Sequence, residues 1–339
     1  MTQIQAPAGQ QPGRRRPTYT TPASPGSDPH GPHTGRAARA LARVSGWWRG
    51  GGPVTVLFLL PMLLVFGLFS WWPIARTVVM AFQQTNLVEP AHWVGFANFH
   101  RVLSDPLLPT ALRNTVVFAG LAFVIGYPIP LLLAIAMSDL RRARGLYAVL
   151  AYLPVVVPPA VAVLLWQFFY DASGDGVFNT VLGWFGIGPV PWLVSAHWVL
   201  PSLVMEATWA AAGGTVIIYL AALTSVPKEL YDAAEVDGAG IWRKLFHITL
   251  PHLRAIMLVT LILQIIGTAQ VFLEPYLFTD GGPDNASLTV LLLIYNYAFG
   301  STTGGGDYGD ATALSLLLAL ALALLSWIYF RLTRSWSDS

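Results

Sequence analysis

The chain has 339 residues, of which 55% are hydrophobic and only 11% are charged, and its formal net charge is +2. A water-soluble domain of this length carries about a quarter of its residues as Asp, Glu, Lys and Arg, so the composition excludes a soluble globular protein. The small net charge provides no field that would attract nucleic acid. The absence of cysteine excludes disulfides, thiolate metal sites and a cysteine nucleophile.

Residues 1–50 differ in composition from the rest of the chain. They are rich in Pro, Gly, Thr and Arg and have no sustained apolar period. Such a segment buries too little apolar surface to offset the entropy of ordering it. We therefore expect a disordered, basic cytosolic tail, with contact to anionic lipid headgroups as the alternative, followed by a transmembrane domain over residues 51–335.

Six apolar runs are long enough for a helix to cross a bilayer about 30 Å thick at 1.5 Å per residue. They are Val54–Ala75, the windows 113–139 and 144–171, Leu200–Leu223, and the windows 254–274 and 310–331. Two further apolar stretches are broken or short, Val177–Val199 and Leu288–Phe299. We expect these two to be interfacial or re-entrant pieces on the outer surface.

The basic residues indicate the orientation of the spans. With the N-terminus inside, the tail and segments 139–146, 224–255 and 331–339 are cytosolic, and they hold 16 of the 19 Lys and Arg residues. This asymmetry obeys the positive-inside rule. The sequence thus predicts an all-α membrane protein with six spans and with both termini in the cytosol.

The cytosolic loop 224–255 carries local signals for two short helices. Pro227 suits a first helical turn, and Glu229 beside it favours the positive end of the helix. Gly238 stands where a left-handed C-cap is expected. We expect a second helix over Ile241–Ile248 that stops at Pro251.

This loop resembles that of binding-protein-dependent ATP-binding-cassette permeases, which has E-A-A, three residues, Gly, nine residues and I-x-L-P. The matching residues, in the same register, are Asp232, Ala233, Ala234, Gly238, Ile248, Leu250 and Pro251. The departure is Asp232, where the family has glutamate; the charge is kept, but the side chain is one methylene shorter. The resemblance implies that these residues couple the permease to an ATPase subunit.

The resemblance covers roughly residues 57–333 and favours the sugar-importing branch, in particular the first permease of maltose- and glycerol-phosphate-type pairs. The stretches that carry it are 94–99, 112–115, 223–231 and 278–283. Leu273 departs from the Asp of many relatives, which weakens any assignment of a particular sugar. The importer of a non-sugar solute with the same architecture stays open as an alternative.

The resemblance implies a type I importer permease in the bacterial cytoplasmic membrane, with cytosolic coupling helices. It also implies four kinds of partner: a second, homologous permease, two ATP-binding subunits, an extracytoplasmic solute-binding protein and membrane lipid. The chain has no G-x-x-x-x-G-K-[ST] sequence, so we expect a non-catalytic subunit without cofactor, whose partners bind the ATP. An ATP-independent secondary transporter is the alternative from another class.

Polar residues within the spans predict the solute pathway. In the fourth span Glu206 and Trp209 share a face, and in the fifth Gln264, Thr268 and Glu274 fall within an arc of about 120° at 100° per residue. Carboxylates at membrane depth usually face a bundle interior or a wet cavity. The alternative places both carboxylates at headgroup level and gives Gln264 a bond to a neighbouring helix. We expect no metal site.

Overall fold

A computed structural model describes residues 52–138, 140, 144–300 and 306–337. The expected tail, residues 1–50, lies outside the described residues. The chain divides into two units, Met1–Leu68 and Phe69–Ser339. The described part of the first unit is mainly helix α2 (Gly52–Phe66), which has no charged residue and is apolar on every side. Such a helix is suited to lipid rather than to water.

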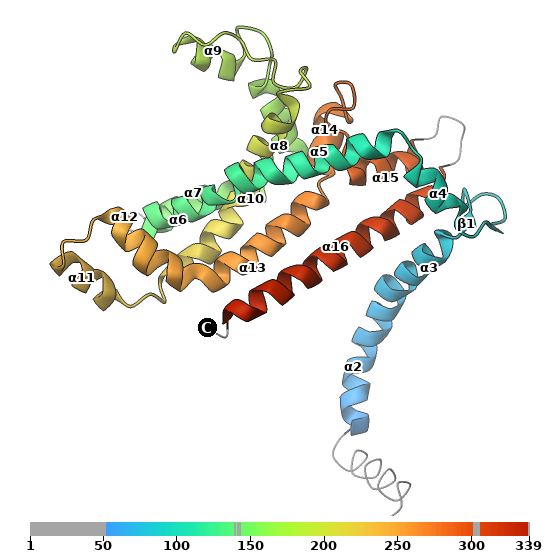
Figure 1. The fold of residues 1–339 in the computed structure, drawn as a ribbon, viewed down its shortest axis with the longest axis horizontal. Helices are drawn as coiled ribbons and strands as arrows, with labels where there is room; N and C mark the ends of the chain where they lie inside the picture. The colour runs from blue at the N-terminus through green and yellow to red at the C-terminus, as the bar shows by residue number, and fades with distance from the viewer. Residues whose placement is uncertain (1–51, 139, 141–143, 301–305, 338–339) are drawn as a thin grey trace, which may run out of the picture. The chain divides into compact units, whose positions relative to one another are not determined.

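The second unit is almost entirely helical (Figure 1). Its α-helices, in chain order, are α3 (Trp72–Met80), α4 (Ala97–Leu103), α5 (Leu107–Leu121), α6 (Pro128–Ser138), α7 (Arg144–Val156), α8 (Pro159–Phe169), α9 (Val177–Gly183), α10 (Val199–Leu223), α11 (Lys228–Val236), α12 (Ile241–Lys244), α13 (Leu250–Ala269), α14 (Leu273–Thr279), α15 (Val290–Phe299) and α16 (Tyr308–Ser337). Wide π-helical turns are η1 (Gly67–Trp71), which begins in the first unit, η2 (Ala122–Gly126) and η3 (Leu245–Thr249). Strands β1 (Gln83–Gln84) and β2 (His92–Trp93) pair antiparallel, with Gln83 opposite Trp93.

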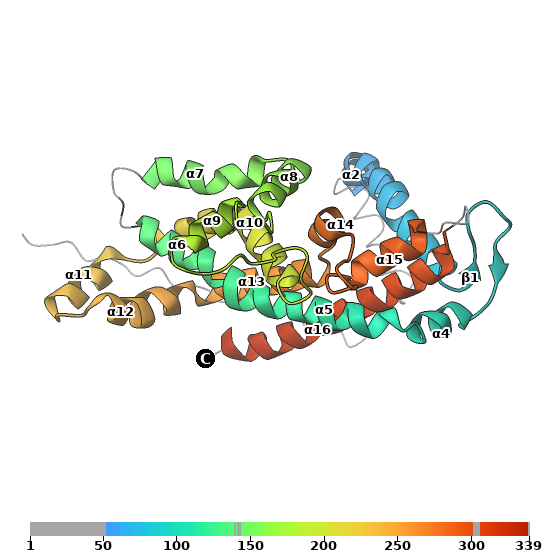
Figure 2. The ribbon, with the colours of Figure 1, turned by 90° about the horizontal axis from the view of Figure 1, so that it is seen from above.

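Within the second unit, α11 and α12 lie at one end, and α4 and β1 lie at the other in both views (Figures 1 and 2). We call the first of these the loop end. Helix α10 packs most extensively against α6 and α7. The approach to α7 is close at Gly213, where an added Cβ would lie 2.1 Å from the carbonyl oxygen of Ala151. Small residues allow helix backbones to meet in this way in membranes.

The described residues contain five helical segments long and apolar enough to cross a membrane, or six if one bent pair is a single span. The five are Val54–Met80, Leu107–Ser138, Val199–Leu223, Ile241–Ala269 and Tyr308–Thr333. The mostly helical fold and its apolar spans agree with the predicted class. The window 144–171, however, is not one straight helix, because Gly145–Val156 and Pro159–Phe169 meet at 98°. Two adjacent prolines explain the bend: Pro158 precedes Pro159 and takes an extended ψ of 132°.

Each of the three wide turns precedes a proline, which is Pro73 in the case of η1. In η2 the Tyr127 amide donates to the Ala122 carbonyl, and Pro128 follows; in η3 the Leu250 amide donates to the Leu245 carbonyl, and Pro251 follows. A proline ring crowds the carbonyl four residues earlier in a regular helix, and a widened turn relieves this crowding. The prediction that a loop helix stops at Pro251 is therefore wrong. The chain is helical from Ile241 to Ala269 without interruption.

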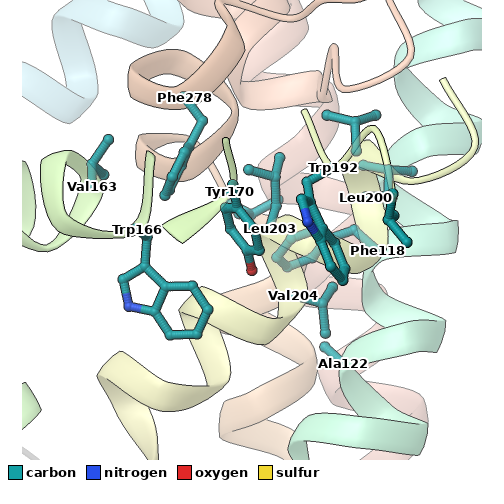
Figure 3. Packing of buried hydrophobic residues seen from close by; sticks show 13 residues of the cluster. Phe118, Ala122, Val163, Trp166, Tyr170, Trp192, Leu200, Leu203, Val204 and Phe278 are labelled. Atoms are coloured by element: carbon teal, nitrogen blue, oxygen red, sulfur yellow. The ribbon is translucent and has the colours of Figure 1, made fainter. Parts of the chain in front are cut away.

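Buried apolar side chains gather around both halves of α10. At its first turns Val199, Leu203 and Val204 pack with the rings of Tyr170 and Trp192, as Figure 3 illustrates for most of this cluster. Toward its last turns Val216, Tyr219 and Leu220 pack with residues of α6 and with Leu253 of α13. A third cluster joins α15 to the start of α16. The middle of α10 thus lies between two packed regions.

The two doubtful apolar stretches do not form spans. In the first, α9 has seven residues, and the chain then returns irregularly to Val199. The Asn179 side chain fixes this return: it donates to the carbonyls of Asp171, Ser173 and Val190, and it accepts from the Val190 amide and the Trp192 indole. In the second, α15 has ten residues, too few to cross a bilayer.

The stretches 94–99 and 112–115 hold the fold together through two asparagines. The Asn98 side chain donates to the carbonyls of Ala81 and Gln83, and that of Asn114 donates to the carbonyls of Asn285 and Leu288. Each asparagine therefore satisfies backbone groups of a distant segment, which would otherwise be buried without partners.

Candidate functional site

The loop 224–255 forms two helices that meet at a tight turn. Helix α11 begins after Pro227 and ends at a left-handed Gly238, whose φ is +70°. The Gly238 amide donates to the Glu235 carbonyl, and the Ala239 amide donates to the Ala234 carbonyl. These two bonds define a Schellman C-cap, in which glycine is favoured because a Cβ is strained at positive φ.

Side chains join α11 to the following helix. The Lys244 Nζ lies 2.8 Å from Glu235 Oε1, and the hydroxyls of Tyr231 and Thr249 are hydrogen-bonded at 2.9 Å. Lys244 holds the pKa of the Glu235 carboxyl below its usual value. The loop is thus a small, internally bonded unit rather than an irregular connection.

Four apolar side chains on and beside the loop helices are exposed, Val236, Ile241, Trp242 and Phe246, and we call them the loop surface. Val236 is 89% exposed, Ile241 79% and Trp242 70%, and the Trp242 and Phe246 rings stack 6.2 Å apart. Exposed apolar patches of this kind mark interaction sites. The loop motif does not include these four residues; the signal for them in the sequence is large apolar side chains within an otherwise charged loop.

The seven loop residues that match the family pattern differ in exposure. Asp232, Ala233, Gly238 and Pro251 are exposed, and Ala234, Ile248 and Leu250 are half-buried. The pattern therefore combines residues that are open to a partner with residues that pack beneath the loop surface.

A cavity of about 540 Å³ lies among η2, α10, α13 and the start of α14. It is lined by Phe118, Ala122, Gly126, Pro130, Val204, Ala207, Thr208, Ala211, Ala212, Thr215, Ile218, Thr260, Leu263, Gln264, Gly267, Thr268, Gln270, Val271, Phe272, Leu273 and Glu274. A mostly apolar pocket with a few placed polar groups is the usual form of a small-molecule site.

Three helical segments converge at Gly126 in the wide turn η2. A Cβ at Gly126 would lie 2.9 Å from Thr208 Oγ1 and 3.4 Å from Gln264 Nε2. The hydroxyls of Thr208 and Thr268 donate to the carbonyls of Val204 and Gln264 in their own helices. Their oxygen lone pairs therefore stay available to accept hydrogen bonds from a ligand.

The structure brings together three of the five residues predicted for the solute pathway. Gln264, Thr268 and Glu274 line the cavity, whereas Glu206 and Trp209 do not. Glu206 is only 3% exposed, and the Trp209 ring packs 5.6 Å from that of Trp166. The assignment of these five residues to the solute pathway stays a prediction, and three of them lie at this cavity.

The cavity uses a neighbouring face of α10. This face carries Val204, Ala207, Thr208, Ala211, Ala212, Thr215 and Ile218, in steps of three and four residues that place them on one side of a helix. The stripe of Ala and Thr is visible in the sequence, but small residues at this spacing are equally typical of contacts between membrane helices.

Glu274 is the ionisable residue in the lining. It stands in the first turn of α14, and burial raises the pKa of its carboxyl. Across the described segments of the chain, no group of three or more His, Cys, Asp or Glu residues could hold a metal ion.

Comparison with known proteins agrees with these features. Residues 126–337 match the family model described as "Binding-protein-dependent transport system inner membrane component". The lactose transport system permease protein LacF of Rhizobium radiobacter is 32% identical over 300 residues, covering 86% of this chain and 94% of that protein. The arabinooligosaccharides transport system permease protein AraP of Halalkalibacterium halodurans is 31% identical over 297 residues, covering 87% and 92%.

The fold also matches a solved structure. A chain from the crystal structure of a bacterial ABC transporter involved in the import of the acidic polysaccharide alginate has a TM-score of 0.73 and 26% identity. The match covers 88% of this chain and 99% of that one, which supports the type I permease fold. The chain therefore belongs to the family of binding-protein-dependent transport system inner membrane components.

Proposed function

We propose that the chain is the permease subunit of an ATP-driven carbohydrate importer and that its loop 224–255 couples the cavity to an ATPase. The observation that carries this proposal is the helix Ile241–Ala269, 29 residues without a break. Its first turns present Trp242 and Phe246 on the exposed loop surface, and Gln264 near its other end lines the cavity. A displacement of the loop is therefore transmitted along one rigid element.

The loop surface suits a protein partner on the cytosolic side. The basic residues around it support a cytosolic position by the positive-inside rule, and the proposal puts both chain ends on that side. Two ATP-binding subunits would dock against this loop and its homologue in a second permease. Asp232 and Ala233 are exposed for such a contact, and Gly238 fixes the angle at which it is presented.

ATP binds to those partner subunits, and this chain itself is non-catalytic. ATP that binds the closed ATPase pair more tightly than the open pair shifts the complex toward its closed state. The paired loops would then approach each other and turn the cavity toward the outside. An extracytoplasmic binding protein would deliver the solute, as in the solved alginate transporter complex with its alginate pentasaccharide-bound periplasmic protein.

A carbohydrate is the solute class that fits the relatives and the cavity. LacF and AraP are permeases of lactose and arabinooligosaccharide systems. Side-chain amides and hydroxyls, as at Gln264 and Thr208, pair with sugar hydroxyls because both can donate and accept. Glu206 and Trp209 stand behind the lining and remain predictions for the pathway.

ATP-driven uptake tests the proposal. The chain, its partner permease and the ATPases are reconstituted into liposomes with binding protein, and accumulation of labelled lactose, trehalose, maltose and arabinotriose is measured. We expect one of these sugars to accumulate with ATP and not with a non-hydrolysable analogue, with no effect of a protonophore. Uptake that needs a proton gradient and no ATP would refute the proposal.

A matched pair of variants tests the loop. Ala234→Asp places a carboxylate on a half-buried site of the loop, where an unpaired buried charge costs about 3–5 kcal/mol. We expect it to remove the ATPase from the purified complex, whereas Ala97→Asp, in α4 at the opposite end of the unit, leaves the ATPase bound. Equal recovery of the ATPase with both variants contradicts the assignment.

A further inference from the structure

The cavity has an unusual balance of charge. Of the 21 side chains that line it, Glu274 is the ionisable one, and none of the others is basic. The stretches of chain between the lining residues, 118–130, 204–218 and 260–274, contain no Lys, Arg or His. This chain therefore offers no cation to a ligand in the cavity.

A second carboxyl stands behind the lining. Glu206 is almost fully buried, and its Oε2 has no hydrogen-bond partner among the described residues. The Trp166 indole N–H is likewise buried without a partner. Neither carboxyl has a compensating positive side chain in the lining that this chain supplies.

A carboxylate on the solute would face the Glu274 carboxyl, which in its ionised form would repel the solute. Two unit charges about 6 Å apart at an effective dielectric constant of about 20 repel strongly enough for roughly a 100-fold loss of affinity. Protonation of Glu274 relieves the repulsion but supplies no cation, so the carboxylate of the solute still loses its water without a partner.

The hydroxyls of an uncharged sugar, in contrast, find hydrogen-bond partners in the lining. Gln264 and Gln270 each provide an amide that donates and accepts, and the hydroxyl oxygens of Thr208 and Thr268 accept. The fold alone does not decide between neutral and acidic sugars, because a solved transporter of the same fold is involved in the import of the acidic polysaccharide alginate. The side chains of the lining decide between them.

From this charge balance we infer that the cavity admits uncharged carbohydrates and rejects those that carry carboxylates. The inference rests on the proposed function, which it narrows from carbohydrates in general to neutral ones. It assigns to Glu274, with Glu206 behind it, the role of excluding uronate-containing sugars.

Saturation-transfer NMR on the complete importer in nanodiscs tests the inference, because it detects weak binding and needs no binding protein. The probes are lactose, trehalose, maltose and arabinotriose, each with the uronate made by oxidising its primary alcohols. The variant Ala211→Trp, which fills the cavity, identifies the signal that belongs to it. Glu274→Lys reverses the charge in the lining, and Glu89→Lys, at an exposed position outside the cavity, is the matched control.

We expect at least one neutral sugar to give a signal that Ala211→Trp abolishes, and its uronate to bind at least about tenfold more weakly. Glu274→Lys should bring uronate binding to within about twofold of the neutral sugar, and Glu89→Lys should leave the preference unchanged. A uronate that binds the unmodified cavity as well as its neutral parent overturns the inference and leaves the proposed function standing. If no sugar gives a cavity-dependent signal and none is accumulated with ATP, the proposed function fails, and the inference fails with it.

Discussion

Two adjacent glycines in α10 allow a sharp test of how this helix packs. A Cβ at Gly213 would lie 2.1 Å from the Ala151 carbonyl oxygen and 2.8 Å from the Tyr152 Cα, whereas a Cβ at Gly214 meets no atom within 4 Å. Both atoms near Gly213 belong to the backbone, so no change of rotamer relieves the contact. Real Cβ contacts shorter than 3.0 Å are essentially unknown, and α7 must therefore move by roughly 1 Å.

Overpacking of this kind costs about 1–3 kcal/mol. A loss of 1 kcal/mol lowers the melting temperature of a domain of 150–250 residues by about 2–4 °C. We therefore expect the melting temperature of Gly213→Ala to lie at least about 2 °C below that of Gly214→Ala, because both variants share the gain in helix preference and only the first is overpacked. Gly214→Ala should leave the melting temperature unchanged or raise it slightly, because alanine favours a helix over glycine by about 1 kcal/mol.

The assay is thermal unfolding of the detergent-purified chain, followed by the loss of its monodisperse peak in size-exclusion chromatography. Each variant is compared with the unmodified protein in the same detergent and salt. Equal shifts for the two variants would refute the close approach of α10 and α7, and with it the placement of Gly213 away from the cavity.

Three further predictions follow from single positions. Gly238→Val should weaken the loop, because a β-branched residue resists a φ of +70°. Hydrogen exchange of α11 should be faster in the variant than in the unmodified chain, while that of α15 stays unchanged. Equal exchange rates of α11 in the two proteins would count against the C-cap. Burial raises the pKa of Glu274. Its carboxylate therefore destabilises the fold at pH values above the unfolded pKa, and this penalty disappears below the unfolded pKa. Glu274→Gln should raise the melting temperature at pH 8 but not at about pH 4, and a gain that is independent of pH would contradict this. Asn179→Ala leaves several buried backbone groups without partners, at a cost of about 1–3 kcal/mol; a melting temperature unchanged from that of the unmodified chain would exclude the anchoring role.

Local chemistry made parts of the structure predictable from the sequence. Pro227 and Gly238 fix the start and end of α11 through their own backbone preferences, and both act as expected. Apolar length alone located the spans. The spacing of the loop motif agreed with the family because Gly238 occupies a turn at positive φ, a geometry that few residues other than glycine adopt.

Features that depend on neighbouring helices were harder to predict. Pro251 is a helix breaker by local rules, but η3 widens the turn before it and the helix continues. Glu206 and Trp209 lie on a polar face of α10, yet the aromatic cluster around Trp166 occupies that side. The face that reaches the cavity is selected by tertiary packing, which periodicity does not contain.

In the proposed importer, the loop 224–255 transmits the force of an ATPase to the cavity. Because the chain has no cysteine, a single cysteine at Val236 tests it directly in the assembled importer. We expect Val236→Cys to cross-link to the ATP-binding subunit and to be shielded in intact cells from an impermeant thiol reagent. Labelling by that reagent from outside, with no cross-link to the ATPase, would contradict the account.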